Sequence, residues 1–331
     1  MFDLLINSEV IVEDVAMAER TLIDALGFPP QKPQWSNTTP GKGFTFLFAR
    51  VHSSLKVSPT RIEAMAVAPV DDSADPATTI QFLPALMTAQ GRRPWKTHAN
   101  ELATSDIHGV AERLRQNGCR FFTMPATEGN PFTRLWLGWT GADPGRYEPD
   151  VDGGLMLEIC ETGALMQGAQ LWDPVPALDL PPGSMVRVLR RSWIVEDLDQ
   201  SLAALDRNLA LVPRFGPDVD RGGAWRSARF DFAHSRSAEL EVLEPIGPGE
   251  VRDSLETWGP GAWVIRIGVT DLEAKAEDLD RRGTSYERRR EEATAETLWV
   301  DTGPLGMPGL FEFAEVDELG SPLWEGPTGS S

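Results

Sequence analysis

The sequence has only two cysteines, Cys119 and Cys160, and only four histidines among its 331 residues. Two thiols cannot make a disulfide framework or a cysteine-rich zinc site, so we expect a reducing, cytoplasmic setting. No run of about 18 apolar residues is present, and such a run is needed for a membrane-spanning helix. The first residues, MFDLLINSEVIVEDV, lack the cationic segment and long apolar stretch of a signal peptide.

Positive charge is also scarce, with 31 Lys and Arg against 50 Asp and Glu and a formal net charge of −19. A phosphate backbone would be repelled by such a surface, so we expect neither a nucleic acid nor a membrane as partner. The glycine-rich segments PGKGF and DRGGAW do not match a phosphate-binding loop. A content of 41% hydrophobic and 24% charged residues is typical of a globular protein, and the length suffices for two cores.

Four segments share one pattern: alternating apolar residues, an aspartate, an amphipathic helix, and a Gly or Pro that ends it. The segments start at Ile6, His98, Leu189 and Val264. Each contains an aspartate that can cap the amides of the following helix: Asp14, Asp106, Asp197 and Asp271. In the third copy, leucines recur at helical spacing at positions 198, 202, 205 and 209, which predicts one apolar stripe.

Shorter strand-like runs follow each helix and end in an apolar segment with an embedded glutamate. These glutamates are Glu63, Glu158, Glu241 and Glu312. Each copy therefore predicts one strand, one helix and three further strands, a βαβββ module, and the chain is predicted to be an α+β protein of four such modules in two tandem pairs.

The first pair is expected to span residues 1–162 and the second residues 184–317, separated by a linker at 163–183 that is rich in Pro and polar residues. The individual modules are expected at about 1–67, 93–162, 184–245 and 258–317, with a loose tail at 318–331. Because tandem pairing within one chain covers the edges of the modules, both a monomer and a homodimer are compatible with the sequence.

The motifs VEDV (Val12–Val15), VEDL (Val195–Leu198) and DVDGGLMLEICE (Asp150–Glu161) are similar to those of the vicinal oxygen chelate superfamily. This superfamily includes glyoxalases, bleomycin-resistance proteins and extradiol dioxygenases. The resemblance implies that each module pair forms a cupped mixed sheet around a divalent metal. It also implies a first-strand ligand, usually His, seven positions before the cap Asp, and a last-strand Glu ligand. Such a metal binds two adjacent substrate oxygens and stabilises enolate-like charge.

Transferring this pattern to the first pair places Glu63 and Glu158 at the last-strand positions. The first-strand positions hold Asn7 and Ala99 in place of His, with His98 one residue away. Glu9 and Glu101 lie two residues farther on, and two residues along a strand share a face. The resemblance therefore implies Glu158, Glu63 and His98 as metal ligands and Glu158, Glu101 and Glu63 as catalytic groups. Substrate would contact Asn7, Glu9 and Trp136.

In the second pair, the same positions hold Arg190 and Val264, and Arg266 shares a strand face with Val264. Arginines in a cup favour a bound carboxylate over a metal, so Arg190 and Arg266 are further candidates for substrate contact. We interpret this pair as a degenerate copy. It differs in this from the extradiol dioxygenases, whose ferrous site resembles a two-histidine, one-carboxylate set and lies in the second pair.

These assignments predict an enzyme that acts on a small organic substrate with adjacent oxygens, by proton abstraction or bond cleavage, as a lyase or isomerase. The cofactor is a divalent metal (Mg, Mn, Fe or Zn) or none, and the oxygen-rich ligands favour Mg, Mn or Ca. One alternative is a metal-free protein that binds a small molecule, and another is an extradiol-type dioxygenase. In a purely structural interpretation, Glu158 pairs with an arginine, Trp136 packs in a strand, and the arginines neutralise nearby acids.

Overall fold

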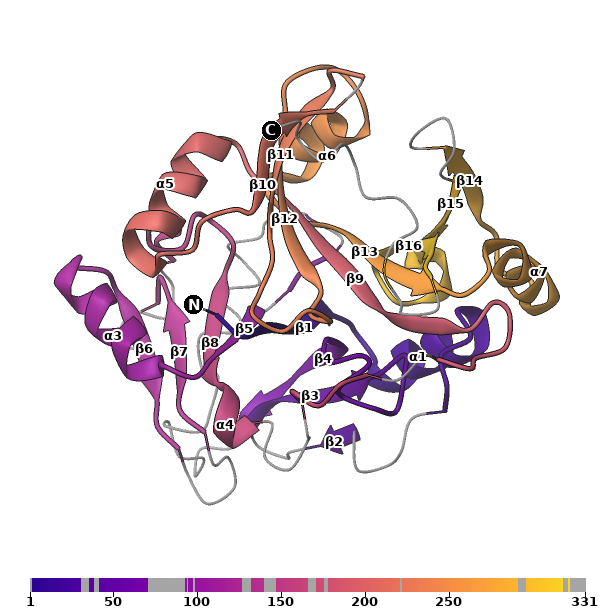
Figure 1. Cartoon of the computed structure of the whole chain (residues 1–331), viewed down its shortest axis with the longest axis horizontal. Helices are drawn as coiled ribbons and strands as arrows, with labels where there is room; N and C mark the ends of the chain where they lie inside the picture. The colour runs from indigo at the N-terminus through magenta and orange to yellow at the C-terminus, as the bar shows by residue number, and fades with distance from the viewer. Residues whose placement is uncertain are drawn as a thin grey trace.

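The computed structural model describes residues 2–30, 36–38, 42–70, 93, 95–97, 99–126, 132–139, 147–165, 171–175, 178–220, 222–290, 296–317 and 321. They form two eight-stranded mixed sheets, with the strand orders β2-β3-β4-β1-β5-β8-β7-β6 and β10-β11-β12-β9-β13-β16-β15-β14 (Figure 1). In each sheet the first strands of two modules pair in the middle. The prediction of four βαβββ modules in two tandem pairs is confirmed.

The first half contains β1 (Leu4–Ile11), α1 (Val15–Arg20) with a π-helical turn (Thr21–Ala25), β2 (Ser36–Thr38), β3 (Lys42–Ala49), β4 (Arg61–Val70), β5 (Asn100–Thr104), α3 (Ile107–Gln116), β6 (Phe121–Met124), β7 (Arg134–Leu137), a 3-10 turn (Pro149–Val151), β8 (Leu157–Glu161) and α4 (Thr162–Leu165). The second half contains β9 (Met185–Ile194), α5 (Leu198–Leu209), β10 (Phe215–Val219), β11 (Trp225–Phe230), β12 (Glu239–Pro245), α6 (Glu250–Trp258), β13 (Gly261–Val269), α7 (Leu272–Arg282), β14 (Glu287–Arg290), β15 (Glu296–Asp301), a 3-10 turn (Gly303–Leu305) and β16 (Leu310–Glu315).

All four predicted cap aspartates accept a hydrogen bond from a backbone amide in the first turn of the following helix. The bonds run from Ala16 N to Asp14 (2.8 Å), Gly109 N to Asp106 (2.9 Å), Gln200 N to Asp197 (2.9 Å) and Ala274 N to Asp271 (2.8 Å). The first helix differs from the others, because after Arg20 it widens into a π turn in which Leu26 N donates to Thr21 O at 3.0 Å. Its apolar residues Ala18, Leu22 and Leu26 are nevertheless buried.

The two central strands of each sheet run antiparallel, and each is flanked by a parallel last strand. In the first sheet, Asn7 lies opposite Arg61 of β4 and Glu101 of β5, and Glu101 lies opposite Glu158 of β8. The second sheet repeats this register at equivalent positions: Arg190 lies opposite Glu239 and Arg266, and Arg266 opposite Glu312. Cross-strand partners face the same side of a sheet, so each sheet has one row of polar side chains across its middle.

The halves pack against each other through one hydrophobic core that contains residues of both. Hydrogen bonds also cross between them: Ser201 of α5 donates to Gly153 O (2.9 Å) and Thr284 donates to Ala25 O (2.9 Å). Figure 1 shows α5 beside β8 and the first strands β1 and β9 near the middle of the molecule. Among the described residues, no helix is both long and apolar enough to span a membrane.

Candidate functional site

A cluster of four buried glutamates occupies the first sheet, on the face opposite the packed helix α3. In β8, Leu157 and Ile159 belong to the main core while Glu158 and Cys160 point the other way, because successive side chains alternate. The same alternation places polar residues of β1, β4 and β5 on this face. Their exposed fractions are 0% for Glu9, 2% for Glu158 and 5% for both Glu63 and Glu101.

Asn7 connects the carboxylates at the centre of the cluster. Its amide nitrogen donates to Glu63 at 2.9 Å and also to Glu101, so one amide lies between two acids. Its carbonyl oxygen accepts from Arg61 Nε at 2.9 Å. The Arg61 guanidinium also lies 3.8 Å from the ring centroid of Phe48, and this contact helps to hold a buried cation in place.

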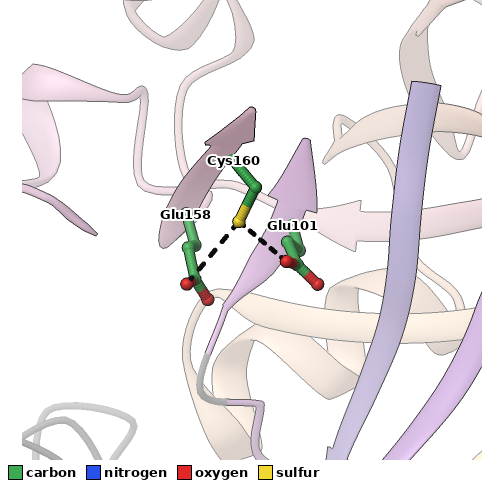
Figure 2. Close-up of side chains that lie close together, drawn as sticks. All are labelled: Glu101, Glu158 and Cys160. Atoms are coloured by element: carbon green, nitrogen blue, oxygen red, sulfur yellow. Dashed lines mark hydrogen bonds between the residues drawn. The ribbon is translucent and has the colours of Figure 1, made fainter. Parts of the chain in front are cut away.

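Cys160 bridges two of the acids from β8 and β5 (Figure 2). Its Sγ lies 2.8 Å from Glu101 Oε1 and 3.8 Å from Glu158 Oε1. Burial, and after it the charge of Glu101, raise the pKa of the Cys160 thiol well above its usual value, so the thiol stays protonated and can donate. Arg134 of β7 lies 3.4 Å from the same Glu158 oxygen.

Glu9 is the least exposed of the four glutamates, and its burial affects its protonation. Burial is the largest cause that raises the pKa of Glu9 well above its usual value, followed by repulsion from Glu101. The backbone amide of Ala99 donates to Glu9 Oε2 at 2.6 Å and acts in the opposite direction. Glu9 is therefore a group that can retain a proton under conditions where an exposed glutamate is ionised.

Two overlapping groups of side chains have the spacing that a metal ion needs. Within each group, one ligand atom per residue lies within 4.8 Å of the others. The first group is Glu9, Glu63 and Glu101, and the second is Glu101, Glu158 and Cys160. Glu101 is common to both, so it is the central acid. Three carboxylates in a buried space fit a hard divalent cation, because the cation would relieve their mutual repulsion.

The structure corrects the assignment of Ala99 and Val264 to the first-strand ligand position, which was placed seven residues before the cap Asp. Ala99 precedes β5, and the residue opposite Asn7 is Glu101, which lies five residues before its cap Asp106 and not seven. In the second half, Arg266 and not Val264 lies opposite Arg190. His98 lies outside the described residues.

Trp136 lies opposite Glu158 in the sheet, but only 1% of it is exposed. Its indole N–H lies 3.1 Å from Met124 Sδ. The described contacts thus place Trp136 within strand packing.

The equivalent positions of the second sheet hold ion pairs formed within the chain. Arg190 lies 3.2 Å from Glu239 and 3.4 Å from Glu241, and Ser192 donates to Glu241 at 2.6 Å. Arg266 donates to both oxygens of Glu312, at 2.6 and 2.8 Å. Arg190 and Arg266 lie opposite each other in the sheet. The carboxylates they bind are the protein's own.

Three residues of the cluster did not emerge as site candidates from the sequence: Arg61, Arg134 and Cys160. Two of them have a local signal: Arg61 lies two residues before Glu63 and Cys160 two after Glu158, which puts each pair on one strand face. Arg134 lies opposite Cys160 in β7, and only the strand pairing reveals this.

Some known protein structures share this architecture. No family model matches the chain. A mutant of 4-hydroxymandelate synthase from Streptomyces coelicolor superposes with a TM-score of 0.60 at 14% identity, over 95% of this chain and 93% of that one. The halotolerant catechol dioxygenase BphC superposes with a TM-score of 0.55 at 11% identity, over 98% and 90%. The chain therefore shares its tandem βαβββ fold with these two proteins.

A sequence match is also found to a protein described as a putative glutamate–cysteine ligase 2-2 from Rhodococcus jostii (strain RHA1). The identity is 25% over 201 residues, which cover 56% of this chain and 49% of that protein. The chain thus matches about half the length of this relative.

Proposed function

We propose that the chain is an enzyme of the vicinal oxygen chelate type that acts on a small organic substrate with adjacent oxygens in the first cup. The observation that carries this proposal is the trio Glu9, Glu63 and Glu101, whose ligand atoms lie within 4.8 Å of one another at 0–5% exposure. In this proposal they hold a divalent cation. The cation would bind the two substrate oxygens and stabilise the charge that develops on them.

Charge balance favours the first cup over the second as the metal site. The described first cluster has four glutamates, Glu9, Glu63, Glu101 and Glu158, and three nearby arginines, Arg61, Arg134 and Arg191. In the second cup four arginines, Arg187, Arg190, Arg229 and Arg266, lie near three glutamates, Glu239, Glu241 and Glu312. Acids therefore outnumber arginines in the first set and not in the second, so an added cation would reduce repulsion in the first cup.

The chain's own groups can supply the proton transfers of a lyase or isomerase. Glu158, ion-paired with Arg134, is the proposed base that takes a proton from substrate. The same carboxyl group, once protonated, would return the proton, because the carboxylate of Glu9 is assigned to the cation and a metal ligand is deprotonated. Asn7 would orient the substrate.

A metal-free binding protein is the second candidate, and one observation favours it. The described cluster already supplies donors to its carboxylates, from the Asn7 amide, the Cys160 thiol and Arg134. Such a protein would capture a ligand in the same cup without turnover. An extradiol-type dioxygenase is a further alternative, distinguished by bound iron and by oxygen consumption with catechols.

The first test is the metal content of protein purified without chelator or a metal-binding tag, measured by elemental mass spectrometry. We expect about one divalent ion per chain, retained in Glu112→Gln and lost in Glu101→Gln. Glu112 is an exposed glutamate of α3 and serves as a matched control. Thermal unfolding with and without added Mg²⁺, Mn²⁺, Fe²⁺ or Zn²⁺ provides a second readout, because a bound ion raises stability. If no ion binds either protein, the metal-assisted mechanism is wrong and the binding protein becomes the leading candidate.

A further inference from the structure

A cavity of about 280 Å³ is formed by residues of both halves, none of which is a glutamate of the cluster. The first half contributes Arg93 and Trp95, and the second contributes α6, the start of β13 and the turn between β15 and β16. The helix α6 is at the top of Figure 1, beside β11 and β12. The lining residues are Arg93, Trp95, Ser254, Trp258, Ala262, Trp263, Asp301, Gly303, Pro308, Gly309 and Leu310.

Arg93 is a buried cation in the wall of this cavity. It is only 3% exposed, and its two terminal nitrogens donate to the carbonyl oxygens of Ala262 and Gly259. Its Nε has no hydrogen-bond partner, and no carboxylate of the described chain forms an ion pair with it. A buried charge whose hydrogen bonds are incomplete is costly, and an anion at this position would offset the cost.

The backbone around Arg93 is shaped to receive it. Gly261 has a φ of +144°, and a Cβ on this residue would lie 2.7 Å from Arg93 Nε. Only a residue without a side chain leaves the guanidinium room at this place. The absence of a side chain at Gly261, the first residue of β13, thus allows Arg93 to occupy the cavity wall.

Three tryptophans from different segments supply flat apolar surface in the same cavity. Trp95 is 5% exposed and Trp258 is 38% exposed, while Trp263 is partly buried. Pro308 and Leu310 add further apolar lining. The one acid of the lining, Asp301, is exposed to solvent, and its Oδ1 already accepts from Gly303 N at 2.9 Å. Water therefore screens the charge of Asp301.

We propose that this cavity binds a small molecule with a flat aromatic body and a carboxylate. The carboxylate would pair with the Arg93 guanidinium, whose terminal nitrogens each have a second N–H besides the one donated to a backbone carbonyl. The ring would pack against Trp95, Trp258 and Trp263. The proposal is independent of the chemistry assigned to the first cup, because none of the residues that line the cavity belongs to the glutamate cluster.

Binding of 2-naphthoate tests the proposal, with the neutral 2-naphthamide as the matched ligand control. We expect 1:1 binding by calorimetry with quenching of tryptophan fluorescence, and affinity for the amide at least about tenfold weaker, because it lacks the charge. Arg93→Gln should weaken naphthoate binding by at least about tenfold, and Trp258→Ala should weaken it several-fold. Trp172→Ala should leave it unchanged, since Trp172 is an exposed tryptophan (59%) outside the cavity.

Two further variants keep the test decisive if Arg93→Gln fails to fold. Ser254→Phe places a large side chain in the cavity and should abolish binding with Arg93 intact. Glu101→Gln should leave binding unchanged, which separates this cavity from the first cup. Equal affinity for acid and amide, no binding at millimolar naphthoate, or loss of binding in Glu101→Gln but not in Ser254→Phe would each overturn the proposal.

Discussion

Asp152 illustrates how burial sets the chemistry of a single carboxyl group next to the candidate site. It is fully buried, and it accepts from Tyr147 OH (2.5 Å), Gly154 N (3.1 Å) and Leu157 N (2.7 Å). Leu157 is the first residue of β8, so Asp152 fixes the start of the strand that carries Glu158 and Cys160. Burial raises the pKa of Asp152 from 3.8 to about 7 and outweighs these three donors, which act to lower it.

This raised pKa predicts a pH-dependent stability. The folded chain holds the Asp152 proton more tightly than the unfolded chain does, so the contribution is fully present below pH 3.8 and is lost as the pH rises through about 7. A shift of this size corresponds to on the order of 4 kcal/mol. Asp152→Asn cannot titrate, so its free energy of unfolding should fall less than that of the parent chain as the pH rises from 4 to 7. Urea titrations at several pH values would measure this.

The matched control for this measurement is Asp150→Asn. Asp150 is an exposed neighbour whose Oδ1 accepts from Gln200 at 2.9 Å. Its pH profile should run parallel to that of the parent chain. A parallel profile for Asp152→Asn as well would show that Asp152 does not carry the effect.

At the level of elements, the features predicted correctly from the sequence are those encoded within a few residues. A cap aspartate followed by apolar residues at helical spacing specifies its helix locally, and all four were found. The closing glutamates Glu63, Glu158, Glu241 and Glu312 also fall in the last strand of each module, because each sits in an alternating apolar run.

The exact site positions were harder to predict because they depend on pairing between distant strands. Asn7 and Arg190 lie seven residues before their cap aspartates, while Glu101 and Arg266 lie five before theirs. The ladder between β1 and β5 shifts register between Leu5 and Asn7, and the ladder between β9 and β13 shifts at three places. A spacing rule applied to one module cannot include such shifts. For the same reason, the sequence allowed an arginine partner for Glu158 but did not identify it as Arg134.

The caps themselves are testable at this scale. Asp271→Ala removes the acceptor of the Ala274 amide in α7 and should lower the free energy of unfolding by about 1 kcal/mol. Glu277→Ala, an exposed acid within the same helix, should change it by less than about 0.5 kcal/mol. Chemical denaturation monitored by circular dichroism measures both. Equal decreases in the free energy of unfolding would show that the loss of a negative charge, and not the loss of the cap, causes the effect.

At the level of the whole molecule, the two halves differ more in charge than in shape. Equivalent positions carry Asn7 and Arg190, or Glu101 and Arg266, on the same framework of strands. The halves also depend on each other physically. Arg191 of β9 is fully buried, donates to Glu9 O at 3.3 Å, and lies 4.3 Å from the ring centroid of Trp95. A side chain of the second half thus supports the strand that carries Glu9.

Because the core and these hydrogen bonds are shared, we expect both halves to unfold in one transition. Asn208 of α5 is 1% exposed and donates to Asp150 O (3.1 Å) and Val151 O (2.8 Å) across the interface. Asn208→Ala removes the donor to the buried Val151 carbonyl and should cost about 1–3 kcal/mol. In urea, tryptophan fluorescence and circular dichroism should shift together to a lower midpoint.

Asn117→Ala is the control that tests whether the loss of stability in Asn208→Ala comes from the burial of its hydrogen bonds or only from their position between the halves. Asn117 also donates across the interface, to Arg207 O at 2.8 Å, but at an exposed position where water can replace it. Its loss should change the free energy of unfolding by less than about 0.5 kcal/mol. If Asn208→Ala instead split the curve into two transitions, the halves would be separate folding units joined by a weak contact. The support that Arg191 gives to Glu9 would then not be needed to keep the first cup folded.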